Sequence, residues 1–209
     1  MSLEAIEFSV SSVDDDEDEF LGAWDRILDG TPCGASLREF VLESYRTYDD
    51  IHILTRLPDS LRGCRLLQKI DLTGCSDIAA LPSWIGELPL VSLNLEETSV
   101  STLPESLRTT ATLRMIMLHM SGLSGPYGGS EEGDVVIGHT TAGPIWLDTP
   151  EGAAEVARRD AVLRPLSLSL PDLRFRLGNQ HWSDFDEPEP AMKWWHAACG
   201  HDWWEEVFY

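Results

Sequence analysis

The chain has 209 residues, of which 43% are hydrophobic and 24% charged, a composition that excludes a wholly disordered protein. Its 36 acidic and 15 basic residues give a net charge of −21, which disfavours nucleic-acid binding and favours a basic partner. No apolar run approaches the roughly 20 residues that span a bilayer, no signal-peptide pattern is present, and the four cysteines are widely spaced. We therefore expect a cytoplasmic protein with reduced thiols and no membrane partner.

Residues 1–53 are expected to form an acidic, helical segment. An acidic run at residues 14–19 precedes apolar residues at helical spacing, Phe20, Trp24 and Leu28. A second helix is predicted from Ser36, because Ser36 and Glu39 have the spacing of a capping box. It would turn three apolar side chains toward a core: Leu37, Phe40 and Val41. The acidic run is interpreted either as a solvated face or as a partner site; it lacks the glycine and final glutamate of a calcium loop.

Residues 54–123 contain an internal repeat. Four positions of the first copy recur 23 residues later and again 23 residues after that: Leu67, Ile70, Leu72 and Cys75. A Leu-Pro pair recurs between the copies, at Leu57, Leu81 and Leu103. Four positions in register over three copies predict a stack of similar structural units that share one core.

The repeat, L-x-x-L-x-L-x-x-C/T/S followed by L-x-x-L-P, resembles the leucine-rich repeats of plant intracellular and bacterial effector proteins. This resemblance covers residues 54–123. It implies a right-handed solenoid of short parallel strands, centred near Ile70, Leu93 and Ile116, with caps at both ends. The expected fold is therefore α/β: a short leucine-rich-repeat solenoid (54–123) with a helical N-terminal cap (1–53) and a mixed C-terminal cap (124–209).

The last position of the repeat holds a small polar side chain in each copy: Cys75, Thr98 and Ser121. In such repeats this position satisfies backbone groups in a buried turn. We therefore interpret Cys75 as a buried structural thiol rather than a nucleophile.

Alternation along each strand predicts which residues point away from the core. If Ile70 and Leu72 point inward, their neighbours form three columns on the concave side, which we call the outward face: Lys69, Ser92 and Met115; Asp71, Asn94 and Met117; Thr73, Glu96 and His119. Exposed methionines adapt to irregular surfaces and favour binding, so these nine residues are the predicted contact surface for a protein partner. The alternative is that C-terminal sequence folds over Met115 and Met117.

Residues 124–180 are predicted to be mixed in structure. After a glycine-rich loop at 124–133, two short strands around a turn are expected at 134–147. A helix is predicted to begin at Pro150 after the cap residue Thr149. Alternating apolar residues predict two further strands, at 166–170 and 173–177, and the second could extend the sheet of the repeats.

Residues 181–209 are rich in tryptophan and acid. Four tryptophans are candidates for a second partner-binding surface: Trp194, Trp195, Trp203 and Trp204. The alternative is a cap that buries the indoles on the last repeat.

Sequence motifs of catalysis are missing, because no GxSxG, Walker loop or HExxH occurs. His196, Cys199 and His201 lie close together and His181 could add a fourth ligand, but their spacing is not that of a standard zinc finger. We therefore predict a non-enzymatic protein with no metal and no cofactor.

An acidic, non-enzymatic binding module suits a basic target that it reaches by electrostatic steering. We therefore predict a bacterial immunity protein that binds and neutralises a basic toxin, such as a nuclease. The alternative is a leucine-rich-repeat effector or adaptor that acts on a host protein. A third hypothesis is an enzyme that uses the His196, Cys199 and His201 cluster.

Overall fold

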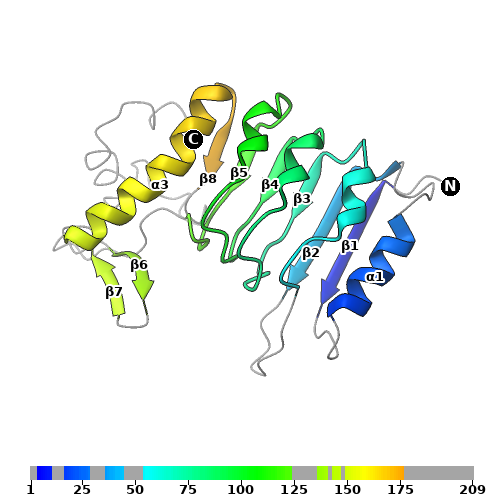
Figure 1. Cartoon of the computed structure of the whole chain (residues 1–209), viewed down its shortest axis with the longest axis horizontal. Coiled ribbons are helices and arrows are strands. Elements are labelled where there is room, and N and C mark those ends of the chain that lie inside the picture. Colours follow the sequence, from blue (N-terminus) through cyan, green and yellow to red (C-terminus); the bar gives the residue numbers. More distant parts are fainter. Residues whose placement is uncertain are drawn as a thin grey trace, which may run out of the picture.

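The protein is mixed α/β and is built on a parallel sheet (Figure 1). The computed structural model describes residues 4–10, 17–28, 36–44, 54–123, 136–140, 143–146 and 149–176. Its strands are β1 (Ala5–Val10), β2 (Glu39–Ser44), β3 (Lys69–Asp71), β4 (Ser92–Asn94), β5 (Met115–Met117), β6 (Val136–Thr140), β7 (Gly143–Trp146) and β8 (Arg174–Arg176). Its helices are α1 (Glu17–Leu28), α3 (Pro150–Ser169) and the short 3-10 helices η1 (Asp59–Gly63), η2 (Ser83–Glu87) and η3 (Glu105–Thr109).

The sheet has six strands in the order β1-β2-β3-β4-β5-β8, and β6 and β7 form a separate antiparallel pair. The prediction of three adjacent parallel strands in the repeats is confirmed by β3, β4 and β5. Ile70 pairs with Leu93 and Leu93 with Ile116, so the 23-residue spacing of the sequence is also the register of the sheet. Backbone hydrogen bonds continue past the strands, because Leu72 N–H donates to the Asn94 carbonyl at 3.0 Å.

The Leu-Pro pairs introduce the three 3-10 helices. Pro58, Pro82 and Pro104 each stand directly before one of these helices in an extended conformation, with φ of −61°, −67° and −61°. Proline fixes φ near this value, so each pair sets the direction in which its helix begins. The helices η1, η2 and η3 follow one another beside the sheet, between α1 and α3 (Figure 1).

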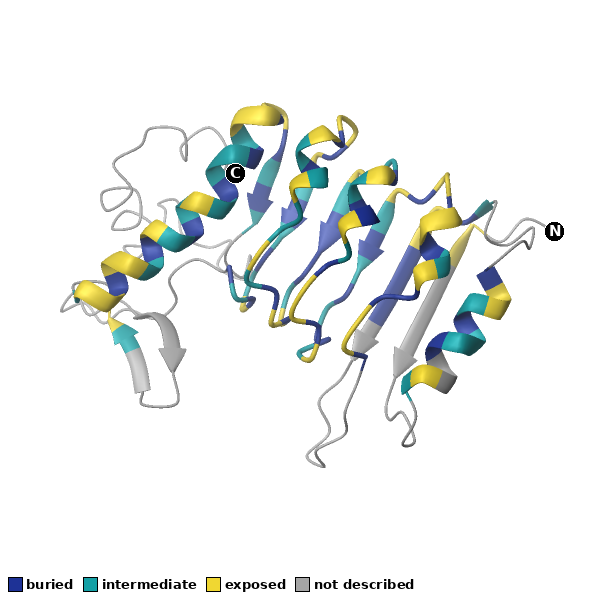
Figure 2. Cartoon of the chain, in the orientation of Figure 1, coloured by how far each residue is buried: buried dark blue, intermediate teal, exposed yellow. Residues whose placement is uncertain are grey.

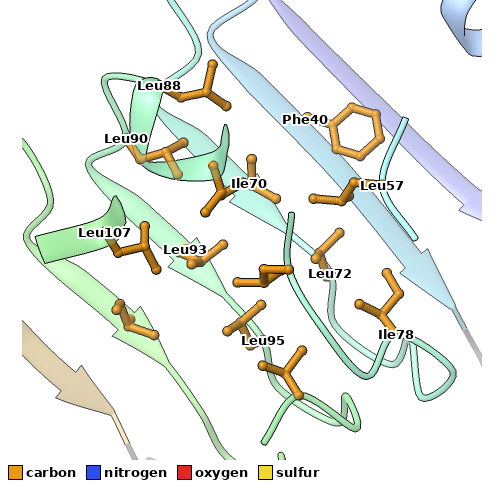
Figure 3. Packing of buried hydrophobic residues seen from close by; sticks show 14 of the residues in the cluster. Phe40, Leu57, Ile70, Leu72, Ile78, Leu88, Leu90, Leu93, Leu95 and Leu107 are labelled. Atoms are coloured by element: carbon orange, nitrogen blue, oxygen red, sulfur yellow. The ribbon is translucent and has the colours of Figure 1, made fainter. Parts of the chain in front are cut away.

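The buried hydrophobic residues of the described ranges form one core between the sheet and the row of helices (Figures 2 and 3). The inner strands contribute fully buried side chains to this core: Phe40 and Leu42 from β2, Ile70 from β3, Leu93 from β4 and Ile116 from β5. The 3-10 helices close the core from the other side with Leu61, Ile85 and Leu107. Burying one such side chain contributes roughly 1.5–3 kcal/mol, so the repeated leucines account for the stacking of the copies.

The last position of the repeat is buried, as predicted. The hydroxyls of Thr98 and Ser121 each donate at 2.8 Å to the carbonyl three residues earlier, Leu95 and Leu118. The thiol of Cys75 lies 3.4 Å from the Leu42 carbonyl. Burial, with smaller contributions from nearby aspartates, raises the pKa of Cys75 to about 12, so the thiolate is disfavoured in the folded state.

Cys75 should therefore resist thiol reagents until the protein unfolds. At pH 8 we expect the Cys75 peptide to stay unlabelled in the native protein and to label fully in urea, as read by peptide mass spectrometry. Cys75→Ser should lower the free energy of unfolding by less than about 1 kcal/mol, because Ser121 already fills the equivalent place. Rapid native labelling of Cys75 would contradict the buried position.

The N-terminal segment differs from the prediction of two helices. Helix α1 is present, and the ring of Trp24 packs edge-on against Phe40 with centroids 5.7 Å apart. The predicted helix from Ser36 is wrong, because Glu39 begins strand β2 instead. Strand β2 buries Phe40 and Leu42 at alternate positions and pairs with β1 on one side and β3 on the other. The strand β1 was not predicted.

Within the described residues 136–140, 143–146 and 149–176, the C-terminal segment follows the prediction except at residues 166–170. The strands β6 and β7 and the cap of α3 are confirmed, since the Thr149 hydroxyl accepts from Gly152 N–H at 3.1 Å. The strand predicted at 166–170 is wrong: α3 continues through Pro165 to Ser169, burying Leu166 and leaving Leu168 75% exposed. Although α3 has 20 residues, neither it nor any other described helix is apolar enough to cross a membrane.

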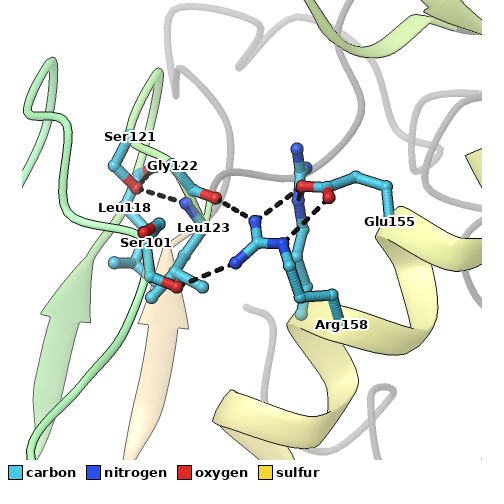
Figure 4. Close-up of polar contacts among 8 residues, drawn as sticks. Ser101, Leu118, Ser121, Gly122, Leu123, Glu155 and Arg158 are labelled. Atoms are coloured by element: carbon cyan, nitrogen blue, oxygen red, sulfur yellow. Dashed lines mark hydrogen bonds and ion pairs between the residues drawn. The ribbon is translucent and has the colours of Figure 1, made fainter.

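Arg158 joins α3 to the end of the repeats (Figure 4). Its guanidinium donates to the Ser101 carbonyl at 2.8 Å and to the Gly122 carbonyl at 2.7 Å. It also pairs with Glu155, which Arg159 contacts at 2.8 Å. Burial opposes ionisation of Glu155, but the hydrogen bonds and charges of Arg158 and Arg159 together outweigh it and lower its pKa.

Candidate functional site

The nine residues of the outward face lie together on the sheet, as the alternation predicted. Pairing places Lys69 beside Ser92 and Met115, and Asp71 beside Asn94 and Met117. The third column follows the strand ends, where Gly74 N–H bonds to the Glu96 carbonyl and Glu97 N–H to the His119 carbonyl. The residues of all three columns are half-buried apart from Asn94, which is 6% exposed. They therefore form a continuous surface that is partly open to solvent.

A hydrogen-bond network orders the polar part of this face. One carboxylate oxygen of Asp71 accepts from the Thr73 N–H at 3.2 Å and from the Thr73 hydroxyl at 2.7 Å. The amide of Asn94 donates to the Thr73 hydroxyl at 2.8 Å and accepts from Glu96 N–H at 3.0 Å. These bonds hold the side chains of Asp71, Thr73 and Asn94 in defined positions, so binding another molecule would remove little of their conformational entropy.

The other carboxylate oxygen of Asp71 is left for weaker interactions. It lies 3.9 Å from the ammonium of Lys69, at the outer limit of an ion pair. The side chains of Asp71 and Lys69 are 14% and 38% exposed, so both can still be reached from solvent. This carboxylate is a candidate acceptor for a cationic or N–H group of a partner.

Two arginines that were not predicted extend the outward face. Strand β8 pairs with β5 so that Arg174 lies beside Met115 and Arg176 beside Met117. The Arg176 Nε lies 3.8 Å from a carboxylate oxygen of Glu96. The alternation of apolar residues around Phe175 predicted a strand here. The 23-residue repeat does not extend to this strand, so its register against β5 could not be predicted.

The charges of the outward face are mixed rather than uniformly acidic. The acidic residues of this face, Asp71 and Glu96, belong to the repeats that contain β3 and β4. Met115 and Met117 lie on the next strand, β5. The β8 arginines then close the row with positive charge. The charge of this surface therefore changes sign from β4 to β8.

Part of the N-terminal acidic run has structural partners. The carboxylate of Glu17 accepts from the Thr55 N–H and hydroxyl, and Asp18 pairs with Arg56 at 2.9 Å. These contacts hold the start of α1 to the chain before η1. Neither role proposed for this run, a solvated face or a partner site, included them.

The remaining predicted sites lie outside the residues that the structure describes. These are the tail tryptophans Trp194, Trp195, Trp203 and Trp204, and the possible metal ligands His181, His196, Cys199 and His201. Across the described ranges, no three His, Cys, Asp or Glu side chains gather as metal ligands would. Cys64 and Cys75, the two described cysteines, are both free and buried.

Neither a scan of protein-family models nor a search of curated proteins finds a match to this chain.

Proposed function

We propose that the chain is a short leucine-rich-repeat solenoid that acts as a non-enzymatic protein-binding module in the cytoplasm. The observation that supports this most is the outward face. Its side chains lie in register on neighbouring strands, half-exposed and linked by the hydrogen bonds of Asp71, Thr73 and Asn94. An ordered polar surface beside apolar methionines is suited to noncovalent recognition of another protein.

We further propose that the partner is basic overall, as a nuclease toxin neutralised by an immunity protein would be. The net charge of −21 supports this, because it raises the rate of encounter with a cationic protein. Since the outward face is mixed in sign, the long-range attraction comes from the acid elsewhere in the chain. The outward face supplies the short-range contacts.

This division of roles predicts how binding responds to salt and to mutation. The probe is the purified product of the gene beside this one, with rates measured by stopped-flow fluorescence. Between about 10 mM and 500 mM salt the association rate should fall by at least about tenfold, while dissociation changes little. The double variant Asp71→Asn, Glu96→Gln should speed dissociation by about tenfold, whereas Asp14→Asn with Asp16→Asn should only slow association.

The substitutions Asp71→Asn and Glu96→Gln keep the size of each side chain and an oxygen that can accept hydrogen bonds. We therefore expect both variants to fold as the parent does. Thermal unfolding of each variant checks this. If the outward-face variant and the N-terminal variant affect only association, and equally, these acidic groups serve steering alone. An association rate that ignores salt would contradict a basic partner.

A further inference from the structure

Met120 occupies a backbone conformation that suits glycine. The same position of the repeat is held by Gly74, Glu97 and Met120, with φ of 79°, 57° and 54°. Left-handed φ is disfavoured for a residue with a side chain, because its Cβ approaches the backbone. Glycine in the first copy follows this rule, whereas the third copy keeps a long apolar side chain there.

That side chain is also unusually open to solvent. Met120 is 58% exposed, more than the other described large hydrophobic residues except Leu168. Met115 and Met117 precede it in the same copy and are half-buried on the outward face. Because the Met120 side chain is exposed, its burial does not stabilise the fold, and glycine would fit this backbone better. The side chain does add apolar surface next to the predicted contact residues.

Opposite charges lie on the two sides of this methionine-bearing copy. Glu96 precedes it on the copy of β4, and Arg174 and Arg176 follow it on β8. The Arg176 Nε is buried and forms no hydrogen bond with the described residues, and the Glu96 carboxylate lies 3.8 Å away. The Arg176 side chain as a whole is 29% exposed, and a guanidinium binds a carboxylate better than the ammonium of lysine does.

We propose that the β5–β8 end of the outward face binds a protein segment that carries a carboxylate next to an apolar side chain. The carboxylate meets Arg174 and Arg176, and the apolar side chain rests on Met115, Met117 and Met120. This inference rests on the proposed function and refines it, because a partner that is basic overall must bring a locally acidic segment to this end. A contact segment with only basic residues would be repelled by Arg174 and Arg176.

Met120→Gly separates binding from folding. It removes the exposed side chain and relieves the left-handed backbone, so the variant should unfold at the same temperature as the parent or higher. Glu97→Gly is the matched control, because it makes the same backbone change in the neighbouring copy. Both variants can be compared directly with the parent.

The probe is a phage-displayed library of random twelve-residue peptides, selected on the full chain. Enriched peptides should combine Asp or Glu with Leu, Met or an aromatic residue. For the best synthetic peptide, Met120→Gly and Arg176→Gln should each weaken binding by at least about tenfold in fluorescence anisotropy, and Glu97→Gly by less than about twofold. Selection on the double variant Arg174→Glu, Arg176→Glu should replace acidic residues by Lys or Arg.

Two results would overturn the inference in different ways. Peptides that lose affinity with Asp71→Asn and Glu96→Gln, but not with Met120→Gly or Arg176→Gln, would place binding elsewhere on the outward face and leave the proposed function standing. Enriched peptides that no outward-face variant affects, or no enrichment at all, would count against both.

Discussion

Gly86→Ala is expected to destabilise the protein by about 3 kcal/mol, although it adds only one methyl group. A Cβ built on Gly86 would lie 2.3 Å from the carbonyl carbon and oxygen of Ser106, in the next 3-10 helix. Backbone atoms cannot rotate away as a side-chain tip would, so η2 and η3 must separate. Their separation would also disturb the core residues Ile85 and Leu107 beneath them.

Gly63→Ala is the matched control for this prediction. Gly63 ends the first 3-10 helix, η1, and a Cβ there would meet nothing within 4 Å. This substitution should change the free energy of unfolding by no more than about 0.5 kcal/mol, which measures the effect of replacing glycine by alanine without a clash. Urea unfolding of both variants measures the difference; equal stabilities would mean that η2 and η3 are not packed this closely.

The repeats could be predicted because one pattern determines both burial and register. Leu67, Ile70 and Leu72 identify the inner side of the first copy, and the 23-residue spacing aligns the next two. Once the inner side is known, alternation assigns the outward face with no further information. The nine outward-face residues in the three repeats could be predicted for that reason.

The ends of the sheet lacked such a pattern. Leu37, Phe40 and Val41 fit a helical face as well as a strand, and what decides for β2 is its pairing with β1 and β3. That pairing joins residues that are distant in the sequence, so local propensity cannot predict it. At residues 166–170 the reverse occurred: the residues of the alternating pattern belong to the end of α3, which buries Leu163 and Leu166, and the C-cap Leu170 is also buried.

The same limit explains what was missed at the candidate site. Arg174 and Arg176 join the outward face only because α3 returns the chain to the edge of β5. Glu17 was part of an acidic run whose interpretation was purely electrostatic, yet its carboxylate has a defined bond to Thr55. The number of charges predicts the overall electrostatic potential, whereas the residue that each carboxylate contacts depends on the fold.

Arg158→Met is expected to lower the free energy of unfolding by about 2 kcal/mol. Arg158 donates to the carbonyls of Ser101 and Gly122, and hydrogen bonds from a charged group contribute roughly 1.5–3 kcal/mol each. Two bonds at the lower end would contribute about 3 kcal/mol, and because the side chain is 38% exposed, water replaces part of this loss. Methionine keeps much of the aliphatic length, and Glu155 keeps Arg159 as its partner at 2.8 Å.

Hydrogen exchange should locate this loss. Amides of α3 and of β8, which follows it, should exchange faster in Arg158→Met, while those of β3 and β4 stay as in the parent. Arg164→Met is the control on the same helix, since Arg164 is 43% exposed and reaches Asp160 only at 3.9 Å. It should cost less than about 0.5 kcal/mol. Uniformly faster exchange across all strands would mean that Arg158 supports the whole fold rather than the attachment of α3 to the repeats.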